Sequence, residues 1–153
     1  MSKRSTTHAT FTLERTYPVA PARVFNAFAD PKAKAKWFAG PADWVAGRRE
    51  MDFRVGGREH DSGGPKGGPV SSFDAVYQDI IPNERIIYAY DMHLGDKRIS
   101  VSVSTIVFAP AGAGTKLTFT EQGVFLDGFD DPSLREKGTS DLLDALGASL
   151  ESK

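Results

Sequence analysis

The segment PSLREKGTSDLLDALGASL (132–150) decides the fold, because here the hydrophobic period changes from that of a strand to that of a helix. Its apolar stripe follows helical spacing and consists of Leu142, Leu143, Leu146 and Leu150. Ser133, with Glu136 three residues later, is typical of a capping box at a helix start. A helix with such a stripe needs a broad apolar partner surface.

The partner surface is supplied by the segments upstream, which alternate with a period of two. Residues 8–17 place Ala9, Phe11, Leu13, Arg15 and Tyr17 on one face. Further strands are expected at about residues 50–55, 72–80, 85–93, 98–108 and 115–125. We therefore expect an α+β fold in which one antiparallel sheet packs against the C-terminal helix.

Two short helices are predicted between the first two strands. Pro21 fits the first position of one helix, and Asp30 followed by Pro31 fits the cap and first turn of the next. Lys32, Lys34 and Lys36 alternate with alanines on this second helix. We expect these lysines to form a solvated face rather than a phosphate site.

A glycine-rich stretch, DFRVGGREHDSGGPKGGPV (52–70), raises the question of a phosphate cradle. Phosphate-binding glycines precede a helix, whereas Gly56 and Gly57 are followed by another short strand. Gly56-Gly57 therefore predicts a turn between strands, and residues 62–69 predict a mobile loop.

The composition is that of one soluble domain spanning residues 1–153. A formal net charge of -1 gives no field that would recruit nucleic acid or an anionic membrane surface. The sequence contains no cysteine, no signal-peptide pattern and no apolar run long enough to span a membrane. These features favour a cytoplasmic protein that binds neither nucleic acid nor membranes.

Catalytic and metal-binding patterns are not evident. His93 and Asp91 share a strand face, but no nucleophile motif accompanies them, and a surface pair is the favoured interpretation. The histidines and carboxylates lack metal-ligand spacing. We expect no catalytic residue, no metal and no cofactor.

Two ionisable residues break an apolar phase. Arg15 lies in the inward set of the first strand, and Glu121 follows Leu117 and Phe119 on the last strand. Because a lone buried charge is costly, we expect Arg15 and Glu121 to point into the concavity and to lie close together. They are either a structural ion pair or a polar anchor for a ligand.

Several segments resemble the Bet v 1-like or START-like (SRPBCC) superfamily, and within it bacterial proteins related to the C-terminal domain of the activator of Hsp90 ATPase. The resemblance rests on LERTYPVAPARVFNAFADPKAKAKWF (13–38), MDFRVGGRE (51–59), YQDIIPNERIIYAY (77–90), GTKLTFTEQG (114–123) and Leu143-Asp144-Ala145-Leu146. Relatives commonly have Gly-Trp near the start of the last helix, where this chain has Gly138-Thr139.

The resemblance implies a helix-grip fold, in which a curved antiparallel sheet of about six to seven strands wraps around the C-terminal helix. It also implies a cavity for an apolar small molecule, with Arg15, Trp37, Phe53, Tyr77, Tyr88, Tyr90, Glu121 and Leu143 as candidate ligand-binding residues. A non-enzymatic ligand-binding module is the leading hypothesis. The alternatives are a chaperone-binding module with a stress-response role and, with less support, a polyketide cyclase-like enzyme. A homodimer is compatible with the sequence.

Overall fold

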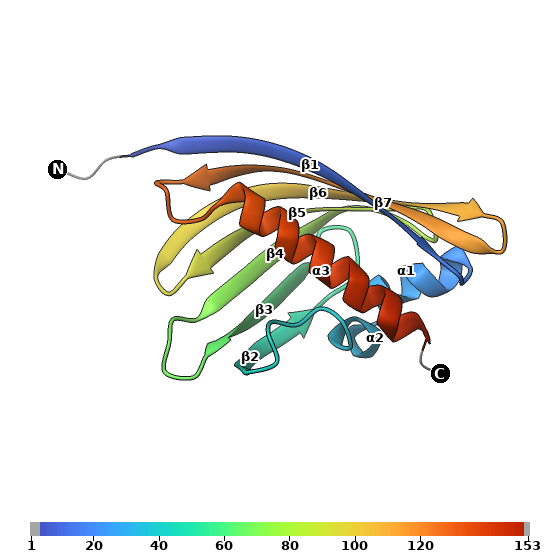
Figure 1. Cartoon of the computed structure of the whole chain (residues 1–153), viewed down its shortest axis with the longest axis horizontal. Coiled ribbons are helices and arrows are strands. Elements are labelled where there is room, and N and C mark those ends of the chain that lie inside the picture. Colours follow the sequence, from blue (N-terminus) through green and yellow to red (C-terminus); the bar gives the residue numbers. More distant parts are fainter. Residues whose placement is uncertain (1–3, 152–153) are drawn as a thin grey trace.

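The computed structural model describes residues 4–151, which form one curved sheet, two short helices and one long helix (Figure 1). The elements in chain order are β1 (Thr6–Tyr17), α1 (Pro21–Ala29), α2 (Pro31–Ala35), β2 (Trp44–Met51), β3 (Arg58–Pro65), β4 (Ser71–Ile81), β5 (Arg85–Leu94), β6 (Lys97–Ala111), β7 (Gly114–Leu126) and α3 (Pro132–Glu151). All strand pairs are antiparallel, and the order across the 7-stranded sheet is β1-β7-β6-β5-β4-β3-β2. The predicted α+β fold is confirmed.

The long helix α3 crosses the concave face of the sheet (Figure 1). Its buried residues Leu143, Leu146 and Leu150 come from the predicted stripe, and Leu142 is half-buried. The Tyr17 hydroxyl at the end of β1 donates a 2.8 Å hydrogen bond to the Leu143 carbonyl oxygen. The last strand residue before α1 therefore fixes the middle of α3 against the sheet.

The start of α3 differs from the predicted capping box. Oδ1 of Asp131 accepts hydrogen bonds from the backbone N–H and the hydroxyl of Ser133, both at 2.9 Å. Asp131 is therefore the N-cap and Pro132 takes the first helical position, where its missing N–H costs nothing. The Ser133–Glu136 interpretation was wrong because a better cap stands two residues earlier.

The strand alternation follows the prediction on β1, where Phe11, Leu13 and Tyr17 face the core. On the neighbouring β7, Leu117, Phe119 and Glu121 are buried on the concave face. Helix α1 covers one end of this face with Val24, Phe25 and Phe28, and the rings of the two phenylalanines contact Phe108. The core is therefore continuous from α1 to the middle of the sheet.

The glycine-rich stretch contains a turn, as predicted, at Gly56, whose φ of 84° is one that glycine adopts readily. The loop expected at 62–69 is shorter, because β3 continues to Pro65, and its mobility stays a prediction. Gly63 and Gly64 pair with β2, and a Cβ on Gly64 would lie 2.4 Å from the Pro69 carbonyl oxygen. Glycine at position 64 permits this close approach of two backbone segments. The strand β3 therefore continues through Gly63 and Gly64, although glycine has a weak strand propensity.

None of the helices described between residues 4 and 151 is long and apolar enough to cross a membrane.

Candidate functional site

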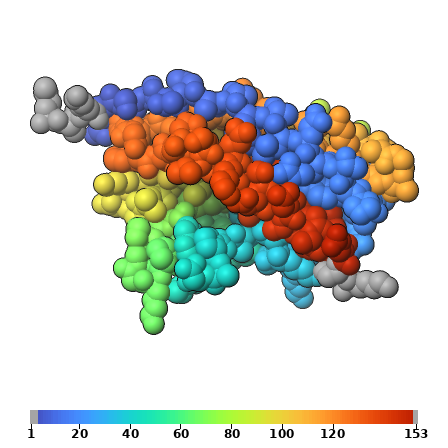
Figure 2. Space-filling model, in the orientation of Figure 1, coloured from blue at the N-terminus to red at the C-terminus, as the bar shows by residue number. Residues whose placement is uncertain are grey.

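A pocket of about 820 Å³ lies between the concave face of the sheet, α3 and the segment that joins α2 to β2. Figure 2 shows this face of the molecule hollowed beside α3, where the cyan segment around β2 borders it. Most of the lining is apolar or aromatic and includes Trp37, Phe38, Phe73, Tyr88, Phe119 and Leu143. Charged groups also contribute to the wall: Lys34, Arg49, Asp61, Glu121, Asp130, Arg135 and Asp141. An apolar pocket with a few polar groups is typical of small-molecule sites.

One buried ion pair stands at the pocket wall. Nζ of Lys34, on α2, lies 2.7 Å from Oε1 of Glu59 on β3, and their side chains are only 5% and 4% exposed. The Tyr77 hydroxyl donates a hydrogen bond to the same Glu59 oxygen. Burial and the Glu59 carboxylate raise the pKa of Tyr77, which keeps this phenol protonated and able to donate.

Aromatic rings surround the ammonium group of Lys34. Its Nζ lies 4.5 Å from the ring centroid of Phe38, 6.0 Å from that of Phe73 and 5.9 Å from that of Tyr88. Each of these rings lines the pocket, whereas Glu59 does not. The Glu59 carboxylate therefore binds the ammonium on the side away from the pocket, and the rings stabilise the cation on its pocket side.

A second polar group is centred on Glu121 of β7. Its Oε1 accepts a 2.9 Å hydrogen bond from Ser104, and its Oε2 accepts one of 2.9 Å from the Tyr90 hydroxyl. Burial raises the pKa of the Glu121 carboxyl, although Arg135 and the two hydrogen bonds act in the opposite direction. A carboxyl in this setting can bind a donor group of a ligand or hold a proton.

Arg135, in the first turns of α3, completes this group. It donates to the Tyr90 hydroxyl at 3.0 Å, to Ser100 at 2.9 Å and to Asp130 at 2.7 Å. Its guanidinium lies 3.9 Å from Glu121. The N-terminal half of α3 is thus held on the sheet by hydrogen bonds to β5 and β6, beside an apolar pocket.

The predicted Arg15–Glu121 pair does not form. Both side chains point to the concave side, but Arg15 donates to Asp144 at 2.9 Å and to the Ser140 hydroxyl at 2.6 Å, both on α3. In the sheet register Arg15 lies opposite Leu117, whereas Glu121 lies opposite Phe11. The charge partner of Glu121 is Arg135, so Arg15 is a contact between β1 and α3.

The structure brings some of the predicted ligand-binding residues together and separates others. Those that line the pocket are Trp37, Tyr88, Tyr90, Glu121 and Leu143. Arg15, Phe53 and Tyr77 lie outside it; Phe53 packs edge-on against Tyr77 and Phe25. A ligand-binding role for the five residues that line the pocket stays a prediction.

Lys34 and Arg135 were missed as pocket residues. The interpretation of Lys34 as part of a solvated face was wrong, because its side chain is buried. On a helix, Lys34 shares a face with Trp37 and Phe38, three and four residues later, and this spacing was the available signal. Arg135 likewise stands four residues before Thr139 and eight before Leu143 on the inward face of α3.

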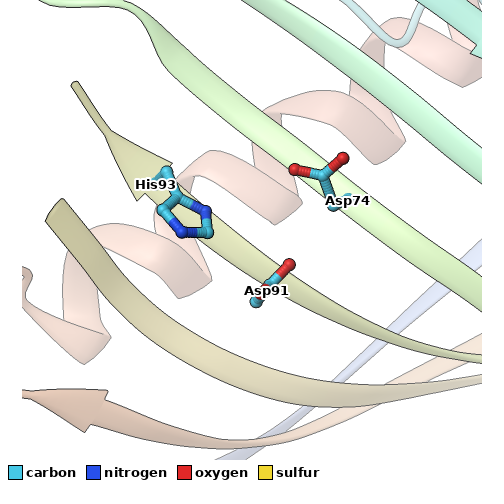
Figure 3. Close-up of side chains that lie close together, drawn as sticks. All are labelled: Asp74, Asp91 and His93. Carbon is cyan, nitrogen blue, oxygen red and sulfur yellow. The ribbon is translucent and has the colours of Figure 1, made fainter. Parts of the chain in front are cut away.

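Another cluster of polar residues lies outside the pocket. Figure 3 shows Asp74 of β4 with Asp91 and His93 of β5 on the side of the sheet away from α3. Their potential ligand atoms lie within 4.8 Å of one another. Asp74 is also 2.6 Å from Nδ1 of His60, and Asp91 pairs with Arg98 at 3.4 Å. These carboxylates already have partners within the protein.

Most of the chain matches a known protein family. The family model described as "Activator of Hsp90 ATPase homolog 1-like protein" matches residues 18–151, which include α1, α3 and the whole pocket. The chain belongs to this family. No curated protein matches the AHSA1-like chain.

Solved structures of similar proteins share the fold over nearly the full length. A protein of Rhizobium leguminosarum is 46% identical, with 99% of this chain and 100% of the other covered and a TM-score of 0.94. A protein of Rhizobium loti is 46% identical, with 95% and 99% covered and a TM-score of 0.88. A protein of Chromobacterium violaceum is 29% identical, with 94% and 98% covered and a TM-score of 0.78. The AHSA1-like chain therefore has the SRPBCC fold.

Proposed function

We propose that this AHSA1-like protein is a binding module that holds a small, mainly apolar molecule in the pocket beneath α3. The supporting observation is the pocket itself, with a volume of about 820 Å³ and walls rich in Phe, Trp, Tyr and Leu side chains. Pockets of roughly 300–1,000 Å³ with apolar walls and a few polar groups hold small ligands. The buried ion pairs in the wall add hydrogen-bonding groups to this apolar space, which suits a molecule with an apolar body and one polar group.

Gly138 offers a way to close this pocket without disturbing the core. It lies on an exposed part of α3 that lines the pocket, and a Cβ at this position would meet nothing within 4 Å. Gly138→Trp should therefore place an indole in or over the pocket while the helix is retained. Ala148→Trp is the matched control, because Ala148 is also exposed on α3 but does not line the pocket.

The test is binding of the neutral fluorophore N-phenyl-1-naphthylamine, measured by fluorescence titration. The wild-type protein and Ala148→Trp should bind the fluorophore with similar affinity, and Gly138→Trp should bind it at least about tenfold more weakly, a loss of about 1.4 kcal/mol. Equal binding by both variants would place the fluorophore elsewhere. A wild-type protein that binds neither this nor other apolar probes would contradict the proposed function.

A protein-binding role is the second candidate, and one observation favours it. Val101, Val103 and Val107 of β6 are 37–40% exposed, on the side of the sheet opposite to the pocket. An exposed apolar row on a sheet can contact another protein. Changing Val103 to Thr should leave fluorophore binding intact, so ligand binding and partner binding can be measured separately.

A further inference from the structure

The Lys34 ammonium has capacity for another hydrogen bond. A lysine ammonium carries three N–H donors. Among residues 4–151, the structure gives Nζ of Lys34 one hydrogen bond, to Glu59. Its other neighbours are the rings of Phe38, Phe73 and Tyr88, which line the pocket and offer no strong acceptor. A molecule between these rings would therefore meet the unused N–H donors of the Lys34 ammonium, which is almost fully buried.

The surrounding charges decide what kind of acceptor fits. Glu59 already neutralises Lys34, and the two arginines that line the same pocket also have carboxylate partners, Asp61 for Arg49 at 3.0 Å and Asp130 for Arg135 at 2.7 Å. Because each of these cations is already paired, an anionic ligand would add an uncompensated buried charge, which is costly. An uncharged carbonyl oxygen can accept from the ammonium without adding net charge, so a neutral acceptor is favoured.

We propose that Lys34 is the residue that determines ligand class, by donating a hydrogen bond to the carbonyl oxygen of a neutral, otherwise apolar molecule. This inference rests on the proposed function, because it assumes that a ligand enters the pocket. It adds the chemistry of the ligand: a ketone, ester or amide whose apolar body lies among Phe38, Phe73 and Tyr88. Hydrocarbons of the same shape bind more weakly, and so do carboxylates.

Three probes with the same two-ring skeleton isolate this contact: benzophenone, diphenylmethane and diphenylacetate. Their dissociation constants can be measured by equilibrium dialysis. Diphenylmethane is more apolar than benzophenone, so partition into an apolar pocket alone would favour diphenylmethane. A hydrogen bond from a charged donor contributes roughly 1.5–3 kcal/mol, so benzophenone should bind the wild-type protein about tenfold more tightly than either other probe.

The matched variant is Lys34→Met with Glu59→Gln, which removes both charges, keeps similar volumes and leaves an acceptor for the Tyr77 hydroxyl. It should bind benzophenone about tenfold more weakly than the wild-type protein does and bind diphenylmethane equally well or better. If it instead binds benzophenone as the wild-type protein does, Lys34 has only a structural role. Circular dichroism of the variant shows that it is folded before binding is measured.

A second measurement on the wild-type protein locates the carbonyl group directly. On irradiation, the benzophenone ketone takes a hydrogen atom from a nearby C–H group, and the two carbon radicals join, so that the ketone becomes a tertiary alcohol attached to the protein. Peptide mapping should find this adduct on Lys34 or on residues that flank it in the pocket, such as Phe38 and Phe73. Binding without a benzophenone preference, or adducts confined to other sites, would overturn this inference alone. Failure of both neutral probes to bind would contradict the proposed function as well.

Discussion

Replacing Lys34 by Met should strongly destabilise the fold, because it leaves the Glu59 carboxylate buried without its cation. The two side chains are 5% and 4% exposed, and their charged atoms are 2.7 Å apart. Removing one partner of a buried ion pair costs roughly 3–5 kcal/mol. The Tyr77 hydroxyl remains as a donor to Glu59, but a neutral hydrogen bond does not replace the lost charge.

The carboxyl group in this variant can escape the penalty by taking up a proton, and this sets an upper limit on the cost. A glutamic acid ionises with an ordinary pKa of about 4.3, so protonation at pH 7 costs about 3.7 kcal/mol, at about 1.36 kcal/mol per pH unit. At pH 5 the same step costs about 1 kcal/mol. The free energy of unfolding lost in Lys34→Met should therefore fall from about 3–4 kcal/mol at pH 7 to about 1–2 kcal/mol at pH 5.

Urea unfolding of the wild-type protein and of Lys34→Met, followed by circular dichroism at pH 7 and pH 5, measures the loss of unfolding free energy at each pH. The double variant Lys34→Met with Glu59→Gln is the control, and it should recover most of the lost stability because it removes the unpaired charge. A loss in Lys34→Met below about 1 kcal/mol at pH 7 would show that Glu59 is hydrated, and the reasoning would fail. A loss that does not shrink at pH 5 would mean that packing, rather than charge, is responsible.

Three further predictions concern α3 and the second polar group. Leu146→Ala removes a fully buried side chain and should cost about 2–5 kcal/mol in urea unfolding, whereas a loss below about 0.5 kcal/mol would contradict the packing of α3 on the sheet. Asp131→Ala removes the cap of α3 and should cost about 0.5–2 kcal/mol, with no comparable loss in Glu136→Ala. Burial raises the pKa of Glu121, so folding favours its protonated form more than the unfolded chain does. The resulting stabilisation is present below the ordinary value of 4.5 and is lost as the pH rises through the folded pKa. The stability of Glu121→Gln relative to the wild-type protein should accordingly increase from pH 4 to pH 7, and a decrease would mean that Arg135 outweighs burial.

Most of the architecture could be predicted because most elements carry a local signal. The strand expected at about residues 50–55 was misplaced, since β2 spans Trp44–Met51. Period-two alternation on β1 and β7 placed Phe11 and Leu117 in the core, and both side chains pack there. The leucine spacing on α3 predicted which side of the helix is buried. These patterns depend only on neighbouring residues within one element, so a single sequence is sufficient to recognise them.

The partners across elements could not be predicted in the same way. Parity alone showed that Arg15 and Glu121 face inward, but only the register, with Arg15 opposite Leu117, shows that they are not adjacent. Lys34 and Glu59 are 25 residues apart and meet because the fold brings α2 beside β3, a contact that no local pattern encodes. The pocket likewise results from the curvature of the sheet and the position of α3, which are properties of the whole fold.

Native mass spectrometry tests the central claim, that the pocket beneath α3 holds a small apolar molecule. The wild-type protein and Gly138→Trp are incubated with an organic extract of the source cells, separated from free small molecules and measured without denaturation. The account predicts a bound small molecule on the wild-type protein that is missing from Gly138→Trp and present on Ala148→Trp. A wild-type protein with only the mass of its polypeptide, or equal adducts on all three proteins, would contradict it.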